Sequence, residues 1–185
     1  MNSAINDDRS LLKHEYAGFA KVLHWMVAAC VLFMIPVGII MGNLPQGDLQ
    51  NSLYNLHRSF GVLVLALMLI RLAYRIIAGT PPAEPTLSAF QRVLSGFVHG
   101  TLYVLLIAQP ILGWVATSAY GAAIWVFGLF QLPPVVEKNE ALAEQLYAVH
   151  DIMGFTIAGL LVLHIGAALY HYFIRRDGVL QRMLP

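Results

Sequence analysis

Histidine is the residue type in this sequence with the clearest capacity for chemistry. Seven histidines occur in the 185-residue chain. Five of them lie within or at the entrances of long apolar stretches: His24, His57, His99, His150 and His164. An ionisable side chain at membrane depth is costly, so each is by default a functional candidate. A hydrogen bond to a neighbouring helix would explain one such histidine, but a set at related spacings is harder to explain that way.

The spacing of the histidines indicates two levels. His150 and His164 are fourteen residues apart, which on one helix leaves them about 40° apart in azimuth and about 21 Å apart along the axis. Such a helix could hold two planar cofactors at opposite depths. Partners at matching depth must come from other helices, which predicts His57 with His150 and His24 with His164.

The donor set favours haem iron over other metals. Zinc or non-haem iron prefers three or four converging ligands, commonly with carboxylates, whereas only Asp151 adjoins a pair and no acid lies deep in a span. Haem iron needs two axial ligands. The single cysteine, Cys30, excludes a disulfide within the chain, a four-thiolate cluster and c-type haem attachment. Any redox cofactor must therefore be held without thiols.

Small residues accompany the histidines. Gly38 follows His24 by fourteen residues and Gly113 follows His99 by fourteen, so each glycine lies on the face of its histidine at the opposite depth. His-x-x-x-Gly occurs at residues 57–61 and 150–154, which places a glycine one turn below each histidine, where a haem rim would pass. The alternative is ordinary small-residue packing between membrane helices.

Arg71 lies fourteen residues after His57, at the depth of the pair His24 and His164. We predict that it is a counter-charge for a haem propionate; the alternative is that it extends to the membrane surface.

Composition and hydropathy define the elements that must position these residues. The chain is 58% hydrophobic and 11% charged, against about 25% charged in an ordinary soluble domain, which excludes a typical water-soluble globule. A net charge of +1 argues against a nucleic-acid partner. Four windows are long enough to cross a bilayer, at about residues 17–42, 54–78, 92–120 and 146–174. We predict one all-α domain over residues 1–185, a four-helix transmembrane bundle surrounded by membrane lipid.

The distribution of positive charge predicts the orientation. Nine basic residues fall on one side of the predicted spans: Arg9, Lys13, Lys21, Arg71, Arg75, Arg92, Arg175, Arg176 and Arg182. The other side has only Arg58 and Lys138. By the positive-inside rule both termini are cytoplasmic. On the outer side, residues 124–130 are too apolar for a solvated loop and too short to span, so they should lie on the interface or over the bundle mouth. Asn139 is a predicted helix N-cap.

Several motifs resemble the bacterial cytochrome b561 family over about residues 16–185. They are Lys-Val-Leu-His-Trp at 21–25, His-Arg-Ser-Phe-Gly at 57–61, His-Asp at 150–151 and the segment 164–177. The resemblance implies a multi-pass protein of the bacterial inner membrane with two b-type haems that exchange electrons with ubiquinone. Superoxide oxidation at the outer face is among the family's activities. It also implies His24, His57, His150 and His164 as the iron ligands.

A quinone near the inner haem would need a hydrogen-bond donor and a proton source. His171 lies seven residues after His164, about 20° away in azimuth and about 10 Å further toward the cytoplasm, and is the first candidate. Arg71, His99 and Tyr172 are further candidates, and His99 could instead bind an inner propionate. The alternative for His171 is an interfacial histidine solvated by headgroups.

These features leave three functional hypotheses. The first is an oxidoreductase that passes electrons from an outer donor, superoxide being the leading one, through two haems to ubiquinone, with no protein nucleophile or base required. The two outer cations face five outer acids, Asp48, Glu137, Glu140, Glu144 and Asp151, a balance that disfavours an anionic donor. The second hypothesis is therefore quinol oxidation with electrons passed to a periplasmic redox protein. The third is a haemless transporter or scaffold that uses the histidines as a proton relay.

Overall fold

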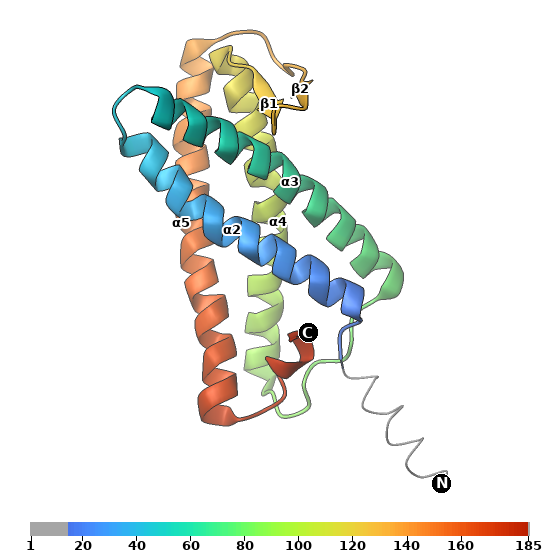
Figure 1. Cartoon of the computed structure of the whole chain (residues 1–185). Coiled ribbons are helices and arrows are strands. Elements are labelled where there is room, and N and C mark those ends of the chain that lie inside the picture. The colour runs from blue at the N-terminus through green and yellow to red at the C-terminus, as the bar shows by residue number, and fades with distance from the viewer. Residues whose placement is uncertain (1–14, 185) are drawn as a thin grey trace.

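The computed structural model describes residues 15–184 and shows four long helices (Figure 1). They are α2 (Gly18–Asn43), α3 (Asp48–Ala78), α4 (Ala89–Tyr120) and α5 (Glu140–Tyr170). Each is long and apolar enough to cross a membrane. This confirms the prediction of an all-α, four-helix transmembrane bundle.

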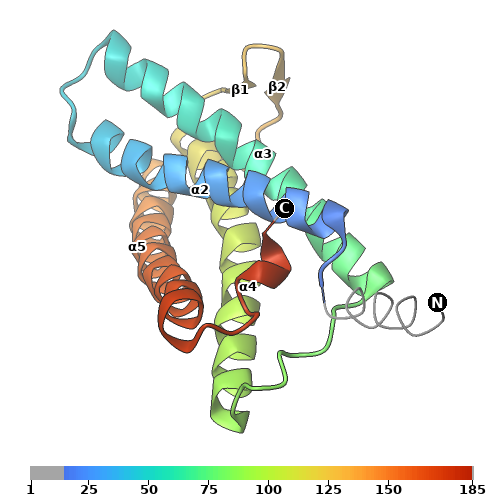
Figure 2. The same cartoon turned by 60° about the horizontal axis from the view of Figure 1, so that its bottom comes forward.

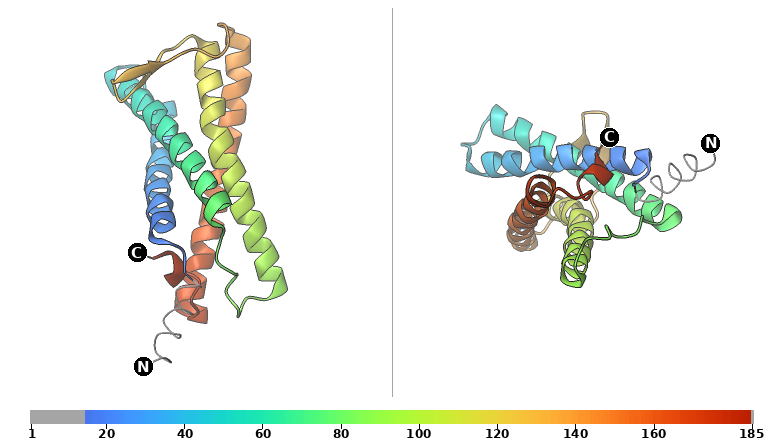
Figure 3. Two further views of the ribbon diagram at one scale, coloured as in Figure 1. Left: turned by 90° about the vertical axis from the view of Figure 1, so that its right-hand side faces the viewer. Right: turned by 90° about the horizontal axis from the view of Figure 1, so that it is seen from below.

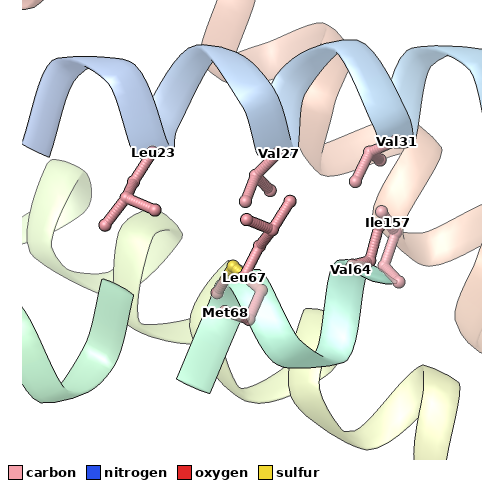
Figure 4. Close-up of a cluster of buried hydrophobic side chains, with 7 residues drawn as sticks. All are labelled: Leu23, Val27, Val31, Val64, Leu67, Met68 and Ile157. Carbon is pink, nitrogen blue, oxygen red and sulfur yellow. The ribbon is translucent and has the colours of Figure 1, made fainter. Parts of the chain in front are cut away.

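The helices associate as two antiparallel pairs. The α2 helix packs against α3, and α4 packs against α5. Figure 3 shows that the first pair crosses the second steeply. A buried cluster joins the pairs (Figure 4): Leu23, Val27, Val31, Val64, Leu67, Met68 and Ile157. Large apolar side chains cover much of the outer surface, as a bilayer environment requires.

The two ends of the bundle carry different structures. We call one the tail end, because the described chain both begins and finishes there: the backbone N–H of Tyr16 donates to the carbonyl oxygen of Arg182 at 3.4 Å (Figure 2). The other is the hairpin end, with β1 (Ile124–Val126) and β2 (Phe130–Leu132). Which end faces the cytoplasm stays a prediction from the count of basic residues. Two of those residues, Arg9 and Lys13, lie outside the described part of the chain.

Local capping explains where the helices begin and end. The side chain of Asn139 accepts a hydrogen bond from the N–H of Leu142 at 3.0 Å, which confirms the predicted N-cap of α5. Ser88 and Gln91 form a capping box at the start of α4, and Gly121 ends that helix at a positive φ of 86°. The α3 and α5 helices begin at Asp48 and Glu140, earlier than the predicted spans, because polar first turns extend each helix beyond its apolar part.

The segment 124–130 forms most of an antiparallel β-hairpin that packs on α3. Its turn, Phe127-Gly128, has both residues at positive φ, which is uncommon for phenylalanine. Ser59 of α3 compensates: its buried Oγ accepts the N–H of Phe127 at 2.9 Å. Its single hydroxyl hydrogen lies within reach of two carbonyl oxygens, that of Asn55 at 2.8 Å and that of Trp125 at 3.1 Å. The Phe127 ring also contacts Phe60, with centroids 5.4 Å apart. The hairpin is thus fastened to the helix that carries His57.

We expect Ser59→Ala to release the hairpin from α3. The substitution leaves the Phe127 N–H without its acceptor, a loss of about 1–3 kcal/mol. Hydrogen exchange of residues 124–132 should become markedly faster. The exposed Ser52, on the same helix, provides the control: Ser52→Ala should leave that exchange unchanged. Equal protection of the hairpin in both variants would contradict this account.

The C-terminal tail folds across the tail end. After α5 the chain continues as a π-helical turn, His171–Arg175, and closes with a short 3₁₀ turn, Gln181–Met183. The indole Nε1 of Trp25 donates to the carbonyl oxygen of Met183 at 2.8 Å. An Arg182 guanidinium nitrogen donates to the carbonyl oxygen of Pro82 at 2.6 Å. The tail therefore links α2 to the α3–α4 connection.

Candidate functional site

The structure brings four histidines together as two pairs. His57 of α3 and His150 of α5 have ring centroids 6.3 Å apart and ring planes at 70°; we call them the hairpin-end pair. His24 of α2 and His164 of α5 have centroids 6.2 Å apart and planes at 70°, and form the tail-end pair. Because both α5 members lie on one helix fourteen residues apart, the pairs are about 21 Å apart along that helix. These are the pairings that the spacing predicts.

The separation within each pair suits one metal atom between two imidazoles. Two metal–nitrogen bonds of about 2 Å each, with about 1.1 Å from each nitrogen to its ring centre, separate two ring centres by about 6 Å. Both pairs match this value. The His99 ring lies only 5.1 Å from the His164 ring, which is too close for the same arrangement.

Three unpartnered polar atoms mark the hairpin-end pair. In the described part of the chain, the buried side-chain atoms without a hydrogen-bond partner are Nδ1 of His57, Nδ1 of His150 and Oε1 of Gln109. All three residues line one cavity of about 380 Å³, whose other walls are mostly apolar. The backbone of Met34 approaches the His57 ring and the backbone of Gln109 approaches the His150 ring, short of full hydrogen-bond geometry. Burying a polar atom unsatisfied costs about 1–3 kcal/mol, so incompletely bonded atoms gathered in one cavity make it a candidate binding site.

Glycines let the hairpin-end imidazoles lie against neighbouring helices. A Cβ on Gly38 of α2 would stand 3.2 Å from Cε1 of His57, and a Cβ on Gly113 of α4 would stand 3.1 Å from Cε1 of His150. Each ring therefore occupies the place of a missing side chain. Two imidazoles seated in this way, with no thiolate nearby, fit the axial ligation of a non-covalent haem.

The two glycines of the His-x-x-x-Gly motifs each lie beside a side chain of the paired helix, and their place at a haem rim stays a prediction. A Cβ on Gly61 would meet Cε of Met34 at 3.7 Å, and one on Gly154 would meet Nε2 of Gln109 at 3.4 Å. Met34 lies four residues before Gly38 on α2, and Gln109 lies four residues before Gly113 on α4. The α2–α3 and α4–α5 pairs thus share one packing pattern: a histidine lies against a glycine of the partner helix, and a long side chain of that helix lies against the glycine that follows the histidine. This shared spacing was the available sequence signal for Met34 and Gln109, which the sequence analysis missed.

Arg71 and His99 lie at the tail-end pair. Nη1 of Arg71 donates to the carbonyl oxygen of Ala20 at 2.7 Å, one turn before His24, and its charge acts on both His24 and His164. Nδ1 of His99 lies 3.2 Å from Oγ of Ser95. A fixed guanidinium beside two imidazoles suits a propionate counter-charge better than a side chain that reaches freely to the surface.

Known proteins identify the family. The family model described as "Prokaryotic cytochrome b561" matches residues 15–185. This chain belongs to that family. It is 33% identical to "Cytochrome b561 homolog 2" of Escherichia coli (strain K12) over 171 residues, covering 92% of this chain and 91% of the relative. It is 31% identical to the "Probable superoxide oxidase CybB" of Yersinia pestis over 163 residues, covering 88% and 92%. It is thus a multi-pass bacterial membrane protein of a redox family.

In this cytochrome b561 family member, His171 is buried rather than solvated. Its side chain lies in a network at the start of the tail: Nδ1 is 2.6 Å from Oδ2 of Asp177, which also accepts from Nε of Arg175 at 3.1 Å. Burial alone would raise the pKa of Asp177, but the His171 and Val179 hydrogen bonds and the nearby cations hold that pKa below its ordinary value. Tyr172, another predicted quinone residue, is exposed and outside this network.

Trp25 is a further residue that the sequence analysis did not select for the site. Its ring lies 5.4 Å from that of His24, and its Nε1 is the atom bound by the tail. The tail of this cytochrome b561 family member is thereby connected to the tail-end pair through one indole. The sequence offered no signal for this contact, since Trp25 and Met183 are 158 residues apart.

We expect Gly113→Ala to displace the His150 ring and reduce cofactor binding at the hairpin-end pair. The new methyl group would press on Cε1 and Nδ1 of His150, although alanine itself favours the helix. Haem content of the purified protein should fall toward half. Gly159→Ala is the matched control on α5, because nothing lies within 4 Å of a Cβ there. Full haem content in Gly113→Ala would refute the role of this clearance.

Proposed function

We propose that this protein carries electrons across the bacterial inner membrane through two non-covalent b-type haems. His57 and His150 would hold one haem, and His24 and His164 the other. The observation that carries the proposal is the presence of two imidazole pairs, each about 6 Å across, at two levels of one helix. When bound, haem supplies a reversible one-electron iron couple.

The surrounding residues would ligate, orient and insulate. The imidazoles set the position of each metal, and the glycine seats of His57 and His150 keep their rings in place. Arg71 would neutralise a carboxylate at the tail-end pair, where its guanidinium is already fixed to α2. The walls of the hairpin-end cavity are mostly apolar, so few protein dipoles there would reorient when an electron moves.

We propose superoxide as the electron donor at the hairpin end, which would face outward. Among the described residues at that end, Lys138 is paired with Glu140 at 2.9 Å, whereas Arg58 has no carboxylate partner and lies over the Tyr54 ring. Arg58 adjoins His57 in sequence, so its positive charge is local to the ligand pair and would attract a small anion despite the surrounding acids. A relative named as a probable superoxide oxidase supports the same donor.

We propose ubiquinone as the acceptor at the tail end. Its reduction takes up two electrons and two protons, which requires a donor that can be reprotonated from the cytoplasm. His171 is suited to this role because Asp177 fixes its Nδ1, leaving Nε2 as the second ring nitrogen for exchange. Arg71 and His99 would serve the tail-end haem rather than the quinone.

A second candidate function runs in the opposite direction, from quinol to a periplasmic redox protein. The observation that favours it is the excess of acids over cations at the hairpin end, which suits a basic partner.

One experiment separates these functions. The purified full-length protein is analysed by absorption spectrum and pyridine extraction, and then given a superoxide source with a water-soluble quinone. The proposal expects two haems per chain and haem-dependent quinone reduction above the uncatalysed rate. A protein that binds two haems but shows no haem-dependent quinone reduction would instead support the quinol-oxidising function. A protein that binds no haem would leave only the transporter or scaffold.

A further inference from the structure

The β-hairpin at residues 124–132 presents an apolar edge that nothing in the described part of the chain covers. Ile124 and Val126 are each only 5% exposed, because β1 packs on α3, whereas Leu129 is 79% exposed and Phe130 is 51% exposed. Large apolar side chains are unfavourable in water, so this edge is suited to an apolar partner. The proposed function assigns it none.

The hairpin lies beside the bundle rather than over its mouth. Seen from below in Figure 3, it projects beyond the layer formed by α2 and α3, on the side away from α4 and α5. The sequence left two positions open for this segment, the bundle mouth and the membrane interface. The observed placement favours the interface.

A row of aromatic rings connects the hairpin to the lipid-facing surface of the helices. The Phe127 ring lies 5.4 Å from that of Phe60 on α3, which in turn lies 4.9 Å from that of Phe33 on α2. Phe33 is exposed on the outer surface and stands ten residues before the end of α2, about 15 Å along the helix axis. The hairpin turn is therefore continuous with the apolar surface of the spans.

The opposite face of the hairpin has the character of a membrane–water boundary. Trp125 pairs with Gln131 across the two strands, so both side chains lie on the face turned away from α3. The indole N–H groups of Trp25 and Trp114 donate to backbone carbonyl oxygens, whereas that of Trp125 has no acceptor among the described residues. An exposed indole with a free N–H is typical of the headgroup level of a bilayer.

The absence of charge favours lipid over a protein partner. Residues 121–136 contain no acidic residue, no basic residue and no histidine. A docking face for a soluble redox protein is expected to carry charges that steer the encounter. The hydrocarbon boundary of a bilayer instead disfavours charged side chains.

We propose that the hairpin is an interfacial anchor, with Leu129 and Phe130 inserted between the headgroups and acyl chains of the adjoining leaflet. Trp125 then lies among the headgroups, which supply acceptors for its indole N–H. Ser59 fastens the hairpin to α3 two residues after His57, so the anchor holds this part of α3 at a fixed depth. The inference requires membrane insertion of the bundle but no cofactor.

Depth-dependent fluorescence quenching tests the anchor. Leu129→Cys is labelled with an environment-sensitive fluorophore after Cys30, the single native cysteine, is removed as Cys30→Ala. The full-length protein is placed in phosphatidylcholine nanodiscs that carry nitroxides high on the acyl chains, and iodide is added separately as an aqueous quencher. Glu144→Cys, at an exposed position near the same end of α5, is the control. We expect severalfold stronger nitroxide quenching and severalfold weaker iodide quenching at 129 than at 144.

The other outcomes overturn the proposal. Equal iodide quenching at the two positions would show that the edge lies in water, where a soluble partner has access to it. Protection from iodide without nitroxide quenching would show that protein covers the edge, as a second copy of this chain would. Phe130→Cys gives a second probe on the same edge, so the test does not depend on one substitution. Haem content does not enter these measurements, so the anchor and the proposed function fail separately.

Discussion

Replacing His150 with alanine is expected to remove one of two haems and leave the other in place. His57→Ala should have the same effect, because the two imidazoles form one pair with ring centroids 6.3 Å apart. His24→Ala and His164→Ala should each remove the other haem. Pyridine extraction would then give about half of the wild-type haem content in each single variant.

Double variants make the pairing decisive. His57→Ala with His150→Ala should retain one haem, whereas His57→Ala with His164→Ala should retain none. His99→Asn should weaken binding of the tail-end haem less than either ligand variant does, since His99 lies too close to His164 to share a metal with it. A protein in which the loss of His57 and the loss of His164 remove the same haem would refute the assignment.

The second large effect is expected at the tail end. His171→Ala should retain both haems and slow quinone reduction at least tenfold, because a positioned proton donor contributes roughly a hundredfold or more to such a step. Asp177→Asn should slow it less, since it weakens the partner of His171 without removing the imidazole. Stopped-flow reduction of quinone by the pre-reduced protein measures both. Wild-type turnover in His171→Ala would show that its role is structural.

The same network gives an expected pH dependence. Asp177 has a pKa in the folded protein below its unfolded value. Its contribution to docking of the tail is therefore complete above the unfolded pKa and is lost as the pH falls through the lower, folded pKa. The protection of residues 177–184 against hydrogen exchange, measured relative to the unfolded chain at the same pH, should fall in acid. Asp177→Asn should be weakly protected at neutral pH as well, and a tail equally protected in acid would contradict this account.

Much of the architecture was predictable from residue order. The four spans follow from apolar windows of about 20 residues, and the common level of His57 with His150 and of His24 with His164 follows from a rise of about 1.5 Å per residue and alternating helix direction. The N-cap at Asn139 was predictable too, because its hydrogen bond joins residues only three positions apart. The role of these histidines as ligands remains a prediction for the haem measurements.

Other features required contacts that no local pattern specifies. The segment 124–130 was apolar enough to exclude a solvated loop, yet its hairpin is secured by Ser59, which is 66 residues from Trp125. The sequence left open whether His171 serves a quinone or is an interfacial residue solvated by headgroups, and only the structure shows that the returning tail buries it against Asp177.

The sequence by itself therefore determined the number of helices, their apolar character and the depth of each histidine, because these depend only on composition and helical rise. The tertiary structure alone decided that Met34 and Gln109 occupy the spaces beside Gly61 and Gly154, and that the tail reaches Trp25. The physical reason is that such contacts depend on how each helix is rotated and crosses its neighbour. That geometry is settled by the packing of all four helices at once.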